Sequence, residues 1–189
     1  MRIDLKRISP NFPDWPSELD VAKGASNWAF LAQQFYCAAQ VLREEADRVK
    51  EEIHEQDQQV EHTEWRLWRM NLGRPAAFCI AFSLELAVKA AYVSQHPDEI
   101  KDGSLGGLKG HSLIEKCKRI SRFDFTDERM KYVKMAEEII LDGKYPVTLK
   151  PIAEITAPYY NANDVYYDSL IDMYHELMKI ASTAPNPLA

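Results

Sequence analysis

Beyond Arg74 at its start, the longest apolar run of the chain, residues 74–93, contains two charged residues, and their types and spacing suit them to bind another molecule. Glu85 and Lys89 are four residues apart, so a helix places them one turn apart in the order that favours an ion pair. A buried ion pair adds little net stability, because both ions lose their water. Its presence here indicates a ligand, a subunit contact or fold specificity. The alternative is a pair at the edge of a bundle, with its aliphatic stems packed.

A second group of candidate ligand-binding residues lies near predicted helix ends. His111 comes from a glycine-rich segment just before a predicted helix, where free N–H groups and the helix dipole favour an anion, and Lys109 and Lys116 add positive charge. The segment does not fit the Gly-x-x-x-x-Gly-Lys-Ser/Thr loop that binds nucleotide phosphates. Lys144 and Tyr145 follow another predicted helix, and the tyrosine ring can stack on a base. The alternatives are a connector whose histidine caps or packs, and a tyrosine packed under the bundle.

A third group of residues interleaves aromatic rings with guanidinium groups. Its members are Trp65, Arg66, Trp68, Arg69 and Arg74. Single-stranded nucleic acid is bound by this composition, because bases stack on the rings while phosphates pair with the cations. Tryptophans three residues apart are equally typical of a helix core with arginines along its rim. The segment is therefore a candidate RNA contact with a structural alternative.

Catalytic residues, metal ligands and cofactors are not predicted. Cys37, Cys79 and Cys117 show no Cys-x-x-Cys spacing and lie in apolar helical patterns, so we expect small buried hydrophobic residues in a reducing compartment. A di-iron centre in a bundle needs two Glu-x-x-His motifs with two more carboxylates, and only Glu51 and His54 match that spacing. No nucleophile-elbow motif for a serine or cysteine triad is present.

The overall charge narrows the class of partner. The chain of 189 residues carries a formal net charge of −6, with a pI near 5.4. Binding to DNA or to an anionic membrane surface relies on clustered positive charge, so we expect neither. The N-terminus lacks the basic head and apolar core of a signal peptide, and the apolar run 74–93 is expected to be too short and too charged to span a bilayer. These features predict a cytoplasmic protein.

Hydrophobic periodicity predicts helices throughout, with no strand pattern of useful length. The expected helices run from an N-cap at Ser26 to Ile53, over 74–93, from a capping box at Ser112, from a cap at Thr126 or Asp127 to a stop at Gly143, and from Asn163 or Asp164 to Ala181. The first of these helices should bury Trp28, Leu31 and Phe35 on one face and expose its charges on the other. The fold class is therefore all-α, an up-down bundle of four to five helices over 26–182, with an extended proline-rich arm over 1–25 and a loose tail over 183–189.

Three segments in this order resemble the HEPN superfamily of helical bundles. They are the Phe-Ser-Leu-Glu-Leu-Ala-Val-Lys-Ala pattern at 82–90, Gly-His-Ser-Leu at 110–113 and Asp-Gly-Lys-Tyr-Pro at 142–146. The resemblance covers residues 26–182. It implies an up-down four- or five-helix bundle that is commonly a homodimer.

The resemblance also implies a class of function. HEPN members include metal-independent ribonucleases of toxin–antitoxin and phage-defence systems, and non-catalytic versions that bind nucleotides or partners, often beside a nucleotidyltransferase. The ribonuclease signature is an arginine, four to six residues and a histidine on a late helix, whereas the match here, Arg48 to His54, lies on the first helix. We therefore expect a non-catalytic module that binds a nucleotide, RNA or a protein partner such as a nucleotidyltransferase. A metal-independent ribonuclease and a purely structural dimeric interaction protein are the alternatives.

Overall fold

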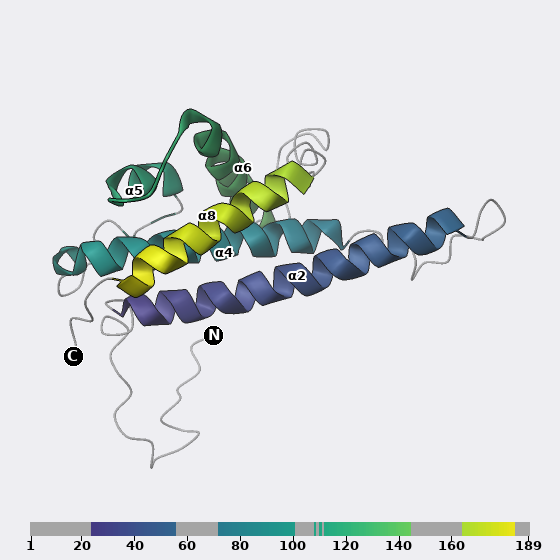
Figure 1. Ribbon diagram of the computed structural model, residues 1–189, viewed down its shortest axis with the longest axis horizontal. Coiled ribbons are helices and arrows are strands. Elements are labelled where there is room, and N and C mark those ends of the chain that lie inside the picture. The colour runs from purple at the N-terminus through teal and green to yellow at the C-terminus, as the bar shows by residue number, and fades with distance from the viewer. Residues whose placement is uncertain are drawn as a thin grey trace, which may run out of the picture.

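The computed structural model describes residues 24–55, 72–100, 108, 110, 112–144 and 164–183. These residues form helices and no strand, which confirms the all-α bundle (Figure 1). The helices are α2 (Ala25–Glu55), α4 (Gly73–Gln95), the 3-10 helix η2 (Pro97–Glu99), α5 (Leu113–Arg119), α6 (Asp127–Lys144) and α8 (Asp164–Thr183). The predicted arm, the tail and the crossover at 146–162 lie outside the described residues.

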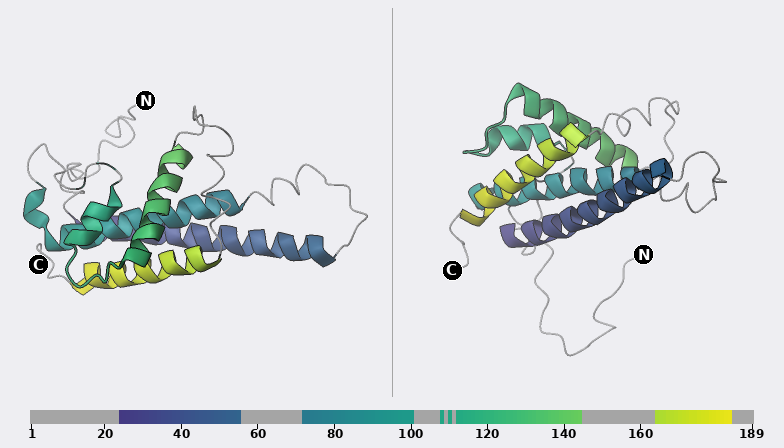
Figure 2. Two further views of the ribbon diagram at one scale, coloured as in Figure 1. Left: turned by 90° about the horizontal axis from the view of Figure 1, so that it is seen from above. Right: turned by 45° about the vertical axis from the view of Figure 1, so that its right-hand side comes forward.

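Helix α4 is the centre of the bundle. It contacts α2, α5, α6 and α8, and α2 lies on the opposite side of α4 from α5 and α6 (Figures 1 and 2). Every residue from Ser83 to Val93 is buried, with Leu84, Ala87 and Val88 fully enclosed. A helix that is apolar on most faces requires neighbours on most sides, and the other four α-helices provide them.

Helix α4 is longer than the apolar run 74–93, which was expected to be too short and too charged to span a bilayer. With 23 residues and a mean hydropathy of 1.7 over its most apolar window, α4 is long and apolar enough to cross a membrane. However, 83% of that window is buried inside the bundle. The central helix of a bundle can be as long and as apolar as a helix that crosses a membrane. The burial of α4 among its neighbours is typical of such a central helix.

Small side chains let α2 and α4 approach each other closely. Ala32, Ala39 and Ala46 recur every seven residues on α2, and all three are buried. The buried Ser83 hydroxyl on α4 donates a hydrogen bond to the Ala32 carbonyl oxygen at 3.0 Å. The side chain of one helix thus reaches the backbone of the other, and its own polar group is satisfied inside the core.

Four predictions about helix ends and faces are settled by the structure. Helix α2 begins at Ala25, so Ser26 is inside the first turn and is not the N-cap. Leu31, expected in the core, is 41% exposed, because the face of α2 that meets α4 is narrower than the apolar pattern. Helix α6 continues through Gly143 to Lys144, so Gly143 does not stop it. At its other end the prediction is confirmed, since the Thr126 hydroxyl accepts a hydrogen bond from the Arg129 N–H at 3.3 Å.

A polar clamp closes the C-terminal end of α4. The Tyr92 hydroxyl donates to the Glu99 carboxylate, which also accepts from the Arg119 guanidinium at the end of α5. That guanidinium lies 5.0 Å from the centre of the Tyr92 ring. Burial, followed by the Glu99 hydrogen bond, raises the pKa of Tyr92 to about 12, so its hydroxyl remains a donor at neutral pH. The hydrogen bonds from Tyr92 and Arg119 lower the pKa of Glu99.

The clamp gives a testable pH dependence. A carboxyl group whose pKa is lowered by folding stabilises the fold above its ordinary value of 4.5, and loses that contribution as the pH falls through the lowered value. We expect Glu99→Gln to lower the melting temperature at pH 7, measured by circular dichroism, and the gap from the native chain to shrink below the ordinary value. The exposed neighbour Asp98 supplies the control variant Asp98→Asn, which should show a smaller gap. An equal gap for Glu99→Gln at pH 7 and pH 3 would contradict the assignment.

Candidate functional site

The Glu85–Lys89 pair lies inside the bundle. The Lys89 Nζ and a Glu85 carboxylate oxygen are 2.6 Å apart, and the two side chains are only 11% and 1% exposed. The Lys89 ammonium also lies 5.1 Å from the centre of the Trp28 ring on α2. The predicted ion pair therefore exists, and it is enclosed between helices, whereas the structural alternative expected it at the edge of the bundle.

A second buried cation joins this pair. Lys116 on α5 is only 4% exposed, and its ammonium donates to the Ser112 carbonyl oxygen at 2.8 Å. Burial, and then the nearby charge of Lys89, lower the pKa of Lys116, while Glu85 and Glu137 act in the opposite direction. Helices α4, α5 and α6 thus bring four charged groups together. We call Glu85, Lys89, Lys116 and Glu137 the charged core cluster.

Glu137, on the neighbouring helix α6, caps the N-terminus of α5. Its carboxylate, on α6, accepts hydrogen bonds from the backbone N–H groups of Leu113 and Ile114, the second at 3.2 Å. The predicted capping box is wrong, because Ser112 makes no capping hydrogen bond through its side chain and Glu115 is exposed, paired with Lys118 at 3.0 Å. The anion expected at this helix start is therefore a carboxylate of the protein itself.

The other candidate residues are only partly described. Lys109, His111 and Tyr145 lie outside the described residues, as does the tryptophan–arginine segment with Trp65, Arg66, Trp68 and Arg69. Lys144 ends α6, and its side chain is not described. Arg74 is exposed in the first turn of α4. Of the predicted ligand-binding set, the structure brings together Glu85 and Lys89, with Lys116 beside them.

The cysteines and the potential metal ligands give a mixed outcome. Cys117 is buried, and burial raises the pKa of its thiol to about 12. Cys79 is half-buried, whereas Cys37 is exposed on α2, so the expectation of a buried residue is wrong there. Within the part of the chain that the structure describes, no group of three or more His, Cys, Asp and Glu side chains is placed to hold a metal ion.

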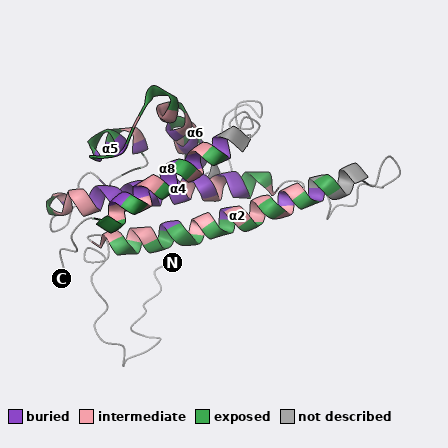
Figure 3. Ribbon diagram, viewed as in Figure 1, coloured by how far each residue is buried: buried purple, intermediate pink, exposed green. Residues whose placement is uncertain are grey.

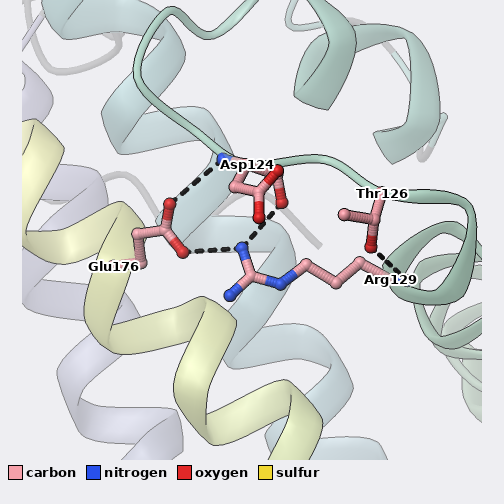
Figure 4. A network of polar contacts seen from close by, with 4 residues as sticks. All are labelled: Asp124, Thr126, Arg129 and Glu176. Atoms are coloured by element: carbon pink, nitrogen blue, oxygen red, sulfur yellow. Dashed lines mark hydrogen bonds and ion pairs between the residues drawn. The ribbon is translucent and has the colours of Figure 1, made fainter.

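A polar network connects α6 to α8 (Figure 4). The Arg129 guanidinium donates to a Glu176 carboxylate oxygen at 2.6 Å and to the Asp124 carbonyl oxygen at 2.7 Å. The second Glu176 oxygen accepts from the Asp124 N–H at 3.1 Å. The network fastens the segment before α6 to the last helix, and each of these donors ends on an acceptor of the protein.

Sequence reasoning missed an aromatic cluster between α2 and α8. The Tyr36 and Tyr174 rings stack with centres 4.6 Å apart, and the Tyr36 hydroxyl lies 3.4 Å from the His175 Nε2. Burial raises the pKa of Tyr174 to about 12. Tyr36 and His175 are almost 140 positions apart in sequence, so no local residue spacing could predict their contact.

The outer face of α2 carries apolar residues that the bundle does not cover. Phe30 and Val41 are each 64% exposed, and Gln34 and Cys37 between them are exposed as well. Figure 3 shows exposed residues along the length of this helix. We call Phe30, Gln34, Cys37 and Val41 the α2 outer strip. The sequence could have indicated this strip, because the apolar residues of α2 cover more of the helix circumference than packing against one neighbour requires.

The three segments that resemble the HEPN superfamily fall at defined places. Residues 82–90 lie within α4, residues 112 and 113 begin α5, and residues 142–144 end α6. Comparison of the chain with known protein families finds no match, and neither curated proteins nor solved structures give one. The superfamily assignment therefore stays a prediction from those segments.

The buried pair predicts a non-additive stability effect. Glu85→Leu or Lys89→Met alone leaves one buried charge without its partner, so each should lower the free energy of unfolding by about 3–5 kcal/mol. The double variant removes both charges and should be nearly as stable as the native chain. Urea unfolding followed by circular dichroism measures all three. The exposed pair gives the control, since Glu115→Leu should cost less than about 1 kcal/mol. Additive losses in the double variant would show that the pair is held by other interactions.

The cap that Glu137 provides for α5 gives a separate prediction. Glu137→Ala leaves the N–H groups of Leu113 and Ile114 without their acceptor and should cost about 1–2 kcal/mol in urea unfolding. It should also speed hydrogen exchange at those two amides. Glu138→Ala, on the exposed neighbour, and Ser112→Ala should change neither quantity appreciably. A loss for Ser112→Ala equal to that for Glu137→Ala would restore the sequence-based cap.

Proposed function

We propose that the protein is a non-catalytic, HEPN-like helical module that works by binding a protein partner through the outer face of α2. One observation carries the proposal. The α2 outer strip exposes Phe30 and Val41 on a helix whose opposite face is already packed on α4. Exposed aromatic and aliphatic residues arranged along one helix face are the anchors that helical partners use.

The charges of α2 favour a protein over a nucleic acid as the partner. Residues 25–42 of α2 carry no charged side chain, so this half of the helix offers no cation for a phosphate. The Arg48 side chain of the ribonuclease-like spacing makes two hydrogen bonds of 2.9 Å to Glu45. That engagement supports a non-catalytic role for the arginine.

The charged core cluster supports the same choice. Glu85 and Lys89 neutralise each other at 2.6 Å, and Glu137 already holds the N–H groups that would attract an anion. A small ligand at this place would have to displace those contacts and their burial. The cluster therefore serves the fold, and the binding surface is on the outside of the bundle.

A photo-crosslinker tests the proposal. Benzoylphenylalanine placed at Val41 should form a covalent adduct with a protein in the cells that make the chain, identified by mass spectrometry. The same group at Leu141, which is 45% exposed on α6, should form none. Adding Phe30→Glu to the Val41 probe should abolish the adduct, because it puts a charge on the apolar strip that makes the contact.

Two outcomes would overturn the proposal. One is the absence of a protein adduct at position 41 under conditions in which the probe reacts with a control partner. The other is an adduct that ribonuclease removes, which would restore RNA as the partner.

A further inference from the structure

The outer face of α2 changes from apolar to charged along its length. Exposed residues follow one another there in steps of four and three, at Phe30, Gln34, Cys37, Val41, Glu44, Arg48 and Glu51. The first four form the α2 outer strip, and the last three are charged. This alternation is the spacing of a seam that packs against a second helix. The seam therefore presents an apolar half and a charged half to the same neighbour.

The charged half of the seam is acidic, because its cation is engaged by the protein itself. Arg48 makes two hydrogen bonds of 2.9 Å to Glu45. Among the residues that the structure describes, the exposed carboxylates of Glu44 and Glu51 have no ion pair or hydrogen bond of their own. Residues 43–55 carry six acidic and three basic side chains, so they hold half of the chain's net charge of −6.

We propose that the partner of this face is an amphipathic helix with a basic half. Its apolar side chains pack on the α2 outer strip, while its Lys or Arg side chains lie against Glu44 and Glu51. The seam from Phe30 to Glu51 measures about 30 Å along the helix axis, so the partner helix has about six turns. This inference rests on the proposed function and names the chemistry of the partner.

The loss of water from the two carboxylates selects the charge of that helix. A helix that packs on the strip and continues along α2 covers Glu44 and Glu51, because they lie in the same seam. A carboxylate that loses water without gaining a cation weakens the association. A partner whose second half is apolar or acidic is therefore rejected, and one with Lys or Arg at the facing positions is favoured.

The charges of α2 disfavour two other occupants. In a pair of α2 helices aligned on their apolar strips, a parallel partner brings Glu44 against Glu44, and an antiparallel partner brings it against residues 25–42, which carry no charged side chain. A second copy thus offers no cation to this carboxylate. Nucleic acid is disfavoured because its phosphates are repelled by the same two carboxylates.

Two matched peptides test the charge of the partner. Each is a fluorescein-labelled helix of about 20 residues, with leucines at the seam positions of one half and either lysines or glutamates at those of the other, made in both chain orders. Fluorescence anisotropy with the native full-length chain should show that the lysine peptide, in one order, binds about 10-fold or more tightly than the glutamate peptide. Val41→Glu should weaken that binding by a similar factor, because the peptide lies on the strip.

Charge reversal gives the matched control. Glu44→Lys with Glu51→Lys should weaken binding of the lysine peptide by about 10-fold or more and strengthen that of the glutamate peptide. Glu128→Lys with Glu138→Lys reverses two exposed carboxylates of α6 and changes the net charge equally. It should leave both affinities within about 2-fold at physiological salt, where distant charges are screened. Circular dichroism should show unchanged helix content in all variants.

The results separate this inference from the proposed function. If the Val41 probe captures a protein but the two peptides bind equally, or neither binds, the inference is overturned and the partner-binding function stays in place. Lysine-peptide binding that Val41→Glu or the reversal at Glu44 and Glu51 leaves unchanged also overturns the inference. So does a native mass near twice 21.8 kDa that Val41→Glu returns to the monomer, since it assigns the strip to a second copy. No binding of either peptide, together with no adduct at position 41, overturns both.

Discussion

Enclosure of α4 on most of its sides is the constraint on which the rest of the structure depends. A helix buried in this way leaves no water for its polar side chains, so Glu85, Lys89 and Ser83 must each find a partner inside the bundle. Glu85 and Lys89 find each other, and Ser83 reaches the backbone of α2. The same constraint draws Lys116 of α5 and Glu137 of α6 toward the centre, where four charges of balanced sign are held together.

In the described part of the bundle, the buried charged side chains have partners within the protein, whereas some large apolar side chains are left exposed. Charged side chains inside the bundle and at the helix ends pair with one another, as in the Arg129–Glu176 network and the clamp at Glu99. The most exposed large apolar residues, by contrast, are Phe30 and Val41 on α2. A surface that leaves large apolar groups uncovered is better suited to a protein than to a small charged ligand.

The sequence predicted the fold well because helices are announced by local periodicity. The central helix, the Thr126 cap and the Glu85–Lys89 pair all depend on residues within a few positions of each other. The features that escaped prediction depend on distant residues. Glu137 caps α5 across 24 positions, where the Ser112 box had the right spacing, and Tyr36 meets Tyr174 only when the last helix packs back. Leu31 shows another limit, since periodicity does not tell which apolar residues of a helix the bundle leaves exposed.

Helix α5 shows how this dependence on distant residues affects folding. It has seven residues, too few for a helix that is stable alone in water, and its first N–H groups are held by a carboxylate that follows later in the chain. During synthesis α5 therefore emerges before the residue that makes it a helix. The acceptor for its first N–H groups is thus available only once α6 has been made and has packed beside it.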